Sequence, residues 1–237
     1  MCGRFSQVER MERLLVELDF FRQVISYYDP EPLGHYNIAP ATRAKVLRAA
    51  TDGLHIDTLK WGWAPGWATG KRPMPINARV ETVASGRFFQ QLWPNGRVLV
   101  PANGWYEWLA DPVQPKNKQP YYIRLKSHAP MFFAGLAQVH PGLEPNDSDG
   151  FVIITDASEA GMLDIHDRRP VVLAPEQARE WLAPGLHAER AETLARCGRA
   201  ASDFEWYPVG KEVGNVRNHG PGLIEPVQLV GEQQMLF

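Results

Sequence analysis

Residues 97–109 read RVLVPANGWYEWL, a run of branched and aromatic side chains that predicts a β-strand in the middle of the chain. Other strand-like runs surround it over roughly residues 36–173, separated by short loops rich in Gly, Pro, Asn and Asp. They lie at residues 45–48, 55–63, 120–126, 131–140, 150–156 and 169–173. Because helices do not alternate regularly with these runs, the sequence predicts a mainly antiparallel, curved or barrel-like sheet.

Helical patterns flank the strand-rich region. Near the start of the chain, Ser6 and Glu9 match a capping box, which predicts a helix directly after Arg4. An apolar stripe follows at Leu14, Leu15, Leu18, Phe21 and Val24. Residues 175–182 and 187–197 predict two more helices. With no repeat or linker inside residues 1–226, we expect one α+β domain over residues 1–227, followed by a flexible tail over residues 228–237.

The composition excludes several classes of protein. The chain has 237 residues, 44% of them apolar, and a net charge of −2, so nucleic-acid binding would need placed arginines and not bulk charge. It has no apolar run of membrane-spanning length and no signal peptide, which predicts a cytoplasmic protein. No zinc, Walker or dinucleotide pattern is present, so we expect neither a metal nor a cofactor. No coiled coil is visible, and a monomer is expected.

Cys2 is a candidate nucleophile because only Met1 precedes it. Removal of Met1 would leave an α-amine and a thiol on one residue, and such an aminothiol can close a thiazolidine ring on an aldehyde. The pKa of the α-amine is about 8, so this group is partly neutral at cellular pH. A neighbouring cation such as Arg4 is expected to activate the thiol. Taken alone, the position of Cys2 favours an incidental residue at a frayed terminus, and the rest of the sequence changes that balance.

Five further blocks follow Met1-Cys2-Gly3-Arg4-Phe5 in order along the chain. They are YNIAP at 36–40, WGWAPGW at 61–67, NARVET at 77–82, GWYEW at 104–108 and HDRRP at 166–170. Together they resemble the SRAP family (SOS response-associated peptidase), over residues 2 to about 227. The bacterial members, which shield abasic sites in single-stranded DNA, look most similar.

The resemblance implies a specific chemistry. It implies that Cys2 forms a stable thiazolidine with the ring-opened abasic sugar, assisted by Asn77, Glu107 and His166. The family name implies a peptidase activity that removes residues before the cysteine. Two alternatives stay open: a thiol peptidase with an N-terminal cysteine nucleophile, and a non-covalent reader of damaged DNA. An imine at the α-amine could also lead to β-elimination, which thiazolidine closure would suppress.

The residues themselves support parts of this interpretation. Trp105 and Glu107 share a face of a strand, and an apolar surround would raise the pKa of the carboxyl toward neutrality. The ordinary pKa of a histidine side chain is about 6.5, which suits His166 for proton transfer. Alternation in a strand predicts Asn77, Arg79 and Glu81 on one face, with an ordinary Arg79–Glu81 surface pair as the alternative.

The predicted contacts to single-stranded DNA are of two kinds. Arg4, Arg79 and Arg168 are the candidates for phosphate contacts. Trp67 follows a Pro-Gly turn that would hold its ring outward, where it could stack on a base. Pro40 is a candidate for the floor of the pocket.

The last five residues, QQMLF, resemble the pentapeptide that binds the bacterial sliding clamp. In that pattern, Leu236 and Phe237 would enter an apolar pocket while Gln233 makes a polar contact. Such binding would bring the protein to replication forks. The alternative is that the apolar end of the tail packs back on the domain.

Overall fold

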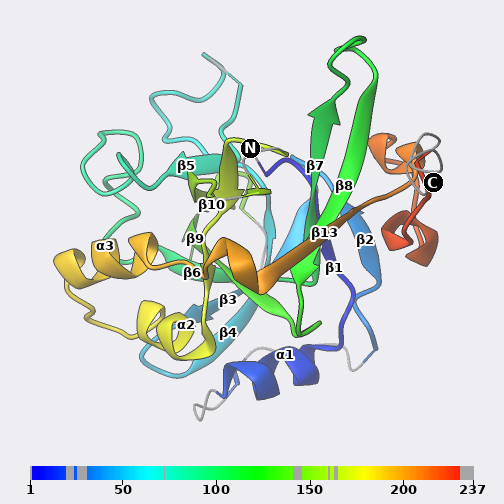
Figure 1. Ribbon diagram of the computed structural model, residues 1–237. Helices are drawn as coiled ribbons and strands as arrows, with labels where there is room; N and C mark the ends of the chain where they lie inside the picture. Colours follow the sequence, from blue (N-terminus) through cyan, green and yellow to red (C-terminus); the bar gives the residue numbers. More distant parts are fainter. Residues whose placement is uncertain are drawn as a thin grey trace.

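The computed structural model contains two antiparallel sheets that pack against each other, with helices at their margins (Figure 1). It describes residues 2–19, 24–25, 31–71, 73–140, 146–159, 161–162 and 165–229. The predicted clamp-binding residues Gln233, Leu236 and Phe237 lie outside this part of the chain. The predicted α+β class with a curved, mainly antiparallel sheet is confirmed.

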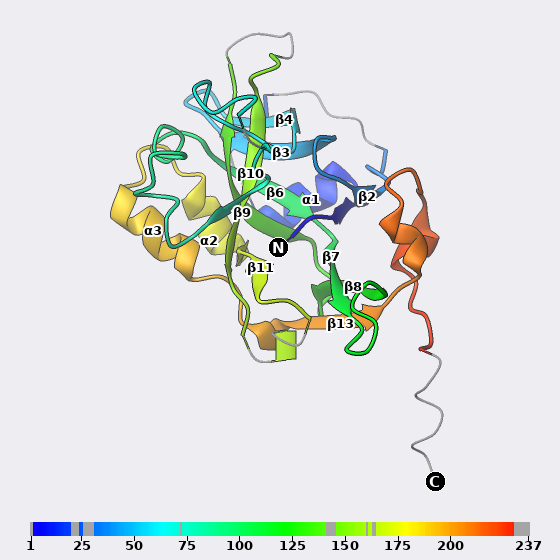
Figure 2. The ribbon, with the colours of Figure 1, turned by 90° about the horizontal axis from the view of Figure 1, so that it is seen from above.

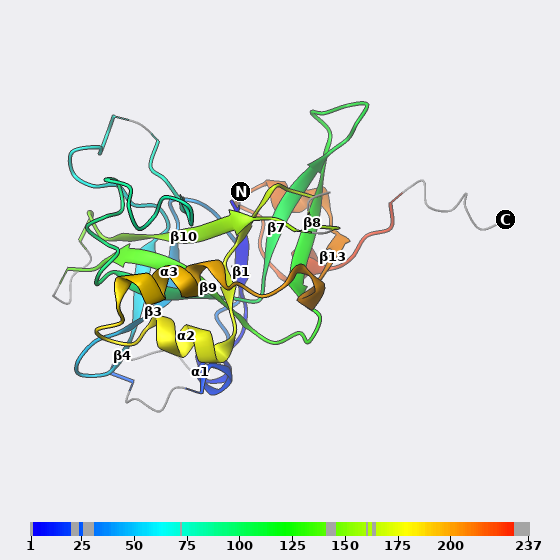
Figure 3. The same ribbon diagram turned by 60° about the vertical axis from the view of Figure 1, so that its left-hand side comes forward.

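The smaller sheet has five strands in the order β13-β8-β7-β1-β2. Their bounds are β13 (Phe204–Pro208), β8 (Lys118–Leu125), β7 (Gly104–Ala110), β1 (Phe5–Gln7) and β2 (His35–Ile38). The hairpin of β7 and β8 projects beyond the rest of the sheet (Figures 1 and 3). Because β1 pairs with β7, with Phe5 opposite Trp105, the start of the chain is fixed beside the strand that contains Glu107.

The larger sheet has eight strands, six of them in the order β11-β10-β9-β6-β3-β4. Their bounds are β11 (Arg168–Pro170), β10 (Gly150–Ala157), β9 (Met131–Gln138), β6 (Arg97–Ala102), β3 (Arg43–Ala49) and β4 (Leu54–Lys60). Of the other two, β12 (Val172–Leu173) pairs with β9, and β5 (Asn77–Arg79) pairs in parallel with β10. Seen from above, the chain start lies near the centre of the molecule, between the two sheets (Figure 2).

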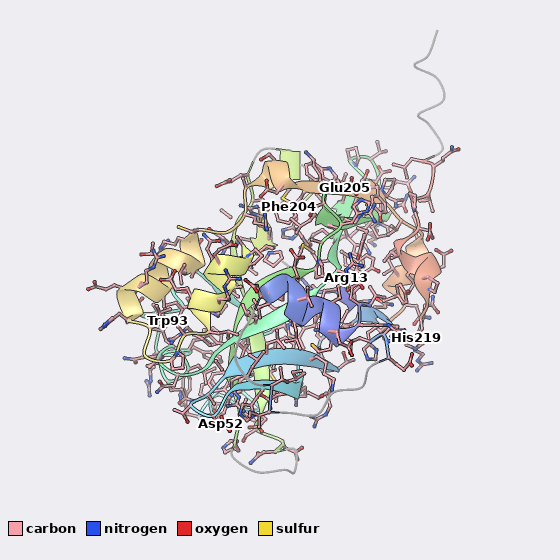
Figure 4. The ribbon with its side chains drawn as sticks, turned by 90° about the horizontal axis from the view of Figure 1, so that it is seen from below. Arg13, Asp52, Trp93, Phe204, Glu205 and His219 are labelled. Carbon is pink, nitrogen blue, oxygen red and sulfur yellow. The ribbon has the colours of Figure 1, made fainter. Side chains whose placement is uncertain are left out.

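Two apolar clusters form most of the core. One lies between the sheets and includes Cys2, Phe5, Trp61, Trp105 and Phe133, all of them fully buried. The other lies between the larger sheet and the helices α1 (Met11–Leu18), α2 (Pro175–Trp181) and α3 (Ala188–Arg196). From below, α1 crosses the underside of the molecule, and Trp93 lies beside α2 and α3 (Figure 4). Short 3-10 helices occur at Ala201–Asp203, Lys211–Gly214 and Pro221–Ile224.

The single strand predicted over residues 97–109 is wrong, because the chain changes sheets at Asn103. β6 ends at Ala102 in the larger sheet, and β7 begins at Gly104 in the smaller one. The Asn103 side chain fixes this crossing by accepting hydrogen bonds from the backbone N–H groups of Val8 and Glu9, at 2.7 and 3.3 Å. Gly104 is needed there since a Cβ atom would collide with the ring of Tyr122.

Two other predicted elements differ in detail. The capping box is wrong, because Ser6 lies in β1, where its hydroxyl is 2.8 Å from the Tyr122 hydroxyl, and α1 starts only at Met11. Of the predicted stripe, Phe21 lies outside the described residues, and Val24 forms a bridge to Leu54 instead of extending the helix. The strand predicted over residues 169–173 is divided between β11 and β12.

Candidate active site

Cys2 lies three residues before β1 and is fully buried between the sheets. Burial raises the pKa of its thiol well above the ordinary range, and the negative charge of Glu107 raises it further. The expected activation by Arg4 is wrong. The Arg4 guanidinium instead donates to Asn37 Oδ1 at 2.6 Å and to the Val213 carbonyl at 2.7 Å. The thiol is therefore protonated at rest and needs a neighbouring base.

Asn77 contacts Cys2 directly. β5 pairs in parallel with β10, with Asn77 opposite Ile153, and this pairing fixes the position of the amide. Its Nδ2 donates to the Cys2 carbonyl oxygen at 2.8 Å. Its Oδ1 is buried and accepts no hydrogen bond from the described residues. A buried amide oxygen of this kind is available to an N–H or O–H group that enters the site.

Glu107 follows Trp105 on the same face of β7, as the alternation of the strand predicts, and its side chain is almost wholly buried. Burial raises the pKa of this carboxyl to about 7, while the positive amino terminus of the chain acts in the opposite direction. Both protonation states are therefore populated near neutral pH. A group with this property can give a proton in one step and take it back in the next.

His166 lies just before β11 and faces the same small cavity as Trp105 and Glu107. Burial lowers the pKa of His166, and the positive amino terminus lowers it further, so the ring is neutral near pH 7. The volume of the cavity is about 10 Å³. That is about the space of one water molecule, which is too small for a sugar.

The pairing of Glu81 differs from both expectations. β5 ends at Arg79 and a turn follows, so Glu81 does not share the face of Asn77. The carboxylate does not form a surface pair with Arg79 either. It binds the Arg168 guanidinium at 2.5 and 2.9 Å, and this hydrogen-bonded pair lowers the pKa of Glu81 to about 2. Arg168 also donates to the Thr155 carbonyl at 2.6 Å, so its charge is used inside the protein.

The other predicted DNA contacts lie nearer the surface. Trp67 is 47% exposed and forms the outward aromatic side chain that its turn predicts. No sequence pattern indicated its neighbours. Arg87 stacks at 5.1 Å from the centre of the Trp67 ring, and the ring of Phe88 meets it edge-on at 5.6 Å. Arg79 is exposed. Pro40 is exposed and does not belong to the walls of the cavity beside Glu107.

Within the described ranges, no group of three or more His, Cys, Asp or Glu side chains is arranged to hold a metal ion. Among the same residues, no helix is long and apolar enough to cross a membrane.

The fold and the site define a class: an α+β protein whose second residue is a buried cysteine, held by an amide and influenced by a carboxyl that shares a cavity with an imidazole. A family model described as SOS response associated peptidase (SRAP) matches residues 1–216. The chain belongs to this family.

Named relatives and solved structures agree with the assignment. The chain is 43% identical to the abasic site processing protein YedK of Escherichia coli K12, over 96% of this chain and 100% of the relative. It is 34% identical to the abasic site processing protein YoqW of Bacillus subtilis, over 95% and 99%. The crystal structure of a phage-related protein from Bordetella bronchiseptica has a TM-score of 0.74 at 38% identity, covering 88% of this chain and 94% of that one. A Bacteroides thetaiotaomicron structure, at 22% identity and a TM-score of 0.76 over 96% and 100%, shares the fold.

Proposed function

We propose that this protein processes abasic sites in single-stranded DNA by forming a covalent thiazolidine with Cys2, which protects the lesion from strand cleavage. The observation that supports this most is the position of Cys2. The residue is held by Asn77 and lies under the electrostatic influence of Glu107, which shares a cavity with His166. The relatives named abasic site processing proteins support the same substrate.

The first chemical step is opening of the abasic sugar. His166 takes the proton of the C1′ hydroxyl, and the electron pair of that O–H bond forms the aldehyde carbonyl. The C1′–O4′ bond breaks, and the ring oxygen takes a proton from the Glu107 carboxyl. Glu107 suits this role because its pKa of about 7 leaves a large protonated fraction at neutral pH.

The second step joins protein and sugar after removal of Met1. The neutral α-amine of Cys2 attacks the C1′ carbon, and the resulting carbinolamine loses water with a proton from an acidic neighbour. The Cys2 sulfur then adds to the imine carbon while its proton passes to the nitrogen. Amine, thiol and aldehyde thus yield one thiazolidine and one water. Cys197 cannot do this, since its nitrogen is in a peptide bond.

The DNA would lie over the exposed side of this pocket. We propose that Trp67 stacks on a base beside the lesion and that Arg79 contacts a phosphate, since both side chains are exposed. Arg4 and Arg168 stay proposals for phosphate contacts, although both guanidinium groups already bind protein atoms. Pro40 stays a proposal for a contact to the DNA.

A second candidate activity is removal of residues that precede Cys2. The family description as a peptidase favours it, as does the hydrogen bond from Asn77 to the Cys2 carbonyl, which holds the residue after the bond to be cut.

We also propose that the protein is a cytoplasmic monomer and that Gln233, Leu236 and Phe237 bind the replication sliding clamp. Calorimetry of a tail peptide with the clamp tests the last of these, and the absence of heat of binding would end that proposal.

A denaturing gel tests the main proposal. The purified protein is mixed with single-stranded DNA that holds one abasic site, with undamaged single strands and duplex abasic DNA as controls. The expected result is a heat-stable shifted band that needs the abasic site and disappears with Cys2→Ala. Absence of the band with wild-type protein whose Met1 is removed would overturn the proposal and favour peptide hydrolysis or plain DNA binding.

A further inference from the structure

The ion pair between Glu81 and Arg168 involves a guanidinium that the sequence predicts as a phosphate contact. The two Nη atoms of Arg168 donate to Oε1 and Oε2 of Glu81 at 2.5 and 2.9 Å. Only 10% of the Arg168 side chain is exposed, compared with 47% of the Glu81 side chain. Solvent, and any strand of DNA that arrives from it, therefore meets the carboxylate of this pair before the cation.

The other N–H groups of Arg168 leave little room for a phosphate. One Nη2 hydrogen goes to the Thr155 carbonyl at 2.6 Å, and Nε is buried with no hydrogen-bond partner among the described residues. A phosphate from solvent cannot reach the buried Nε, which leaves the edge formed by the two Nη atoms, where Glu81 is bound. A phosphate that shared this edge with Glu81 would lie beside a negative charge and would be repelled by it.

The two partners differ in how firmly the structure holds them. Arg168 belongs to β11, which pairs with β10, and its Nη2 is also bonded to Thr155 on β10. Glu81 lies beyond the end of β5, in the turn that begins at Arg79. The arginine is therefore the fixed member of the pair, and the half-exposed glutamate is the member that can rotate away.

The charge of Glu81 acts on two of the arginines that we propose as phosphate contacts. The hydrogen bond with Arg168 lowers the pKa of Glu81 to about 2, and the positive charge of Arg79 lowers it further. The carboxylate is thus ionised at neutral pH, and it offsets the positive charge of both arginines.

We propose that Glu81 is a specificity-determining residue: its carboxylate occupies Arg168 in the free protein and has to be displaced by a DNA phosphate, so that undamaged single strands bind weakly. Carboxylate and phosphate each present two oxygens to a guanidinium, which makes them direct competitors. The inference rests on the proposed function for its partner, single-stranded DNA. A strand with an abasic site offsets the cost of the displacement by its bond to Cys2, and an undamaged strand has no such compensation.

The matched control for Glu81→Gln is Asp156→Asn. Asp156 and Glu81 both add negative charge near Arg168, and each amide substitution removes one charge at nearly constant shape. Asp156 Oδ1 accepts from the backbone N–H of Ala157, whereas Glu81 binds the guanidinium itself. A general effect of charge on DNA binding therefore appears in both variants, and the release of Arg168 appears in Glu81→Gln alone.

The test measures binding of an undamaged single strand by fluorescence anisotropy over a series of salt concentrations. Glu81→Gln should bind about tenfold more tightly than wild type, because a neutral amide competes weakly for Arg168. Its slope of log affinity against log salt should steepen by about 0.7, as one added phosphate contact requires. Glu81→Ala should gain at least as much, whereas Asp156→Asn should keep the wild-type slope. If Glu81→Gln has the affinity and slope of Asp156→Asn, or binds more weakly than wild type, the inference is wrong.

The gain in affinity must also depend on Arg168. In an Arg168→Gln background, Glu81→Gln should add no more affinity than Asp156→Asn does, because no guanidinium is left to release. An undiminished gain in that background would overturn the inference and assign the effect to general charge. If Arg168→Gln does not fold, as circular dichroism would reveal, the salt slopes of the single variants decide.

A competition experiment separates this inference from the proposed function. Crosslinking of the abasic single strand is followed while the concentration of an undamaged single strand is raised. Glu81→Gln should be inhibited at a correspondingly lower concentration of the undamaged strand than wild type is, and equal inhibition would overturn the role in discrimination. If wild type itself forms no crosslink, the proposed function fails, and the binding of undamaged strands still decides the role of Glu81.

Discussion

The pocket around Cys2 and the surface around Trp67 are built on opposite principles. In the pocket, Cys2 and Glu107 are buried, and burial shifts the pKa values of both upward. At the surface, Trp67 is 47% exposed and is supported by Arg87 and Phe88. Burial tunes groups that transfer protons, whereas exposure suits groups that grip a flexible strand. Substitutions in the pocket should change the chemistry, and those at the surface the binding.

The largest effect should come from Cys2→Ser, because it keeps the α-amine and removes only the thiol. We expect complete loss of the heat-stable crosslink with abasic single-stranded DNA, since a hydroxyl does not give the stable sulfur ring. The imine should still form, and sodium borohydride should trap it as a band on the same gel. A heat-stable band without borohydride would contradict the role of the sulfur.

Glu107→Gln should have the next largest effect. The amide cannot supply or take a proton, so the rate of crosslink formation at pH 7 should fall about 100-fold or more. Affinity for undamaged single-stranded DNA, measured by fluorescence anisotropy, should stay unchanged because the side chain is buried. A loss of affinity equal to the loss of rate would assign Glu107 to binding. It would contradict the division between a pocket that does the chemistry and a surface that binds the DNA.

The Glu107 carboxyl should also make the free energy of unfolding depend on pH. A raised pKa means that the folded state binds the proton more tightly than the unfolded chain does. The stabilising contribution of Glu107 is thus fully present below about pH 4.5 and is lost as the pH rises through about 7. Relative to Glu107→Gln, the unfolding free energy of wild type should fall by about 3 kcal/mol between these limits.

Urea denaturation at pH 4.5, 6 and 8 measures this difference. The matched control is Glu189→Gln, an exposed position on α3, for which the difference from wild type should stay nearly constant over the series. A constant difference for Glu107→Gln as well would mean that burial does not disfavour the Glu107 carboxylate.

The sequence predicted the residues of both regions better than their partners. The shared face of Trp105 and Glu107 followed from strand alternation, which needs only local order. The Arg168–Glu81 pair did not follow from strand alternation, because it joins residues that are 87 positions apart in the chain. The strand that contains Asn77 also ends before Glu81. The change of sheet at Asn103 was hidden as well, since its cause is the distant Val8, Glu9 and Tyr122. Patterns report local periodicity, and they do not report which strands meet.

At the surface, Trp67→Ala should weaken binding of single-stranded DNA without changing the chemistry. Loss of one stacked base costs about 1–3 kcal/mol, which raises the dissociation constant roughly 5- to 150-fold. At saturating DNA, the rate of crosslink formation should stay near that of wild type. Trp67→Phe keeps a stacking face and should restore most of the affinity. A lower rate at saturation would show that the loop also shapes the pocket.

Arg79→Gln should have the smallest effect and the most specific signature. Removal of a single phosphate interaction should weaken binding only a few-fold at moderate salt and should reduce the slope of log affinity against log salt by about 0.7. Arg13→Gln is the control, since Arg13 is exposed on α1, on the underside of the molecule (Figure 4), far from β5 at the upper side of Figure 1. If both variants shift the slope equally, the effect is one of net charge, and Arg79 does not bind a phosphate. If only Arg79→Gln shifts the slope, the exposed end of β5 lies on the path of the DNA. The other end of the same strand contacts Cys2.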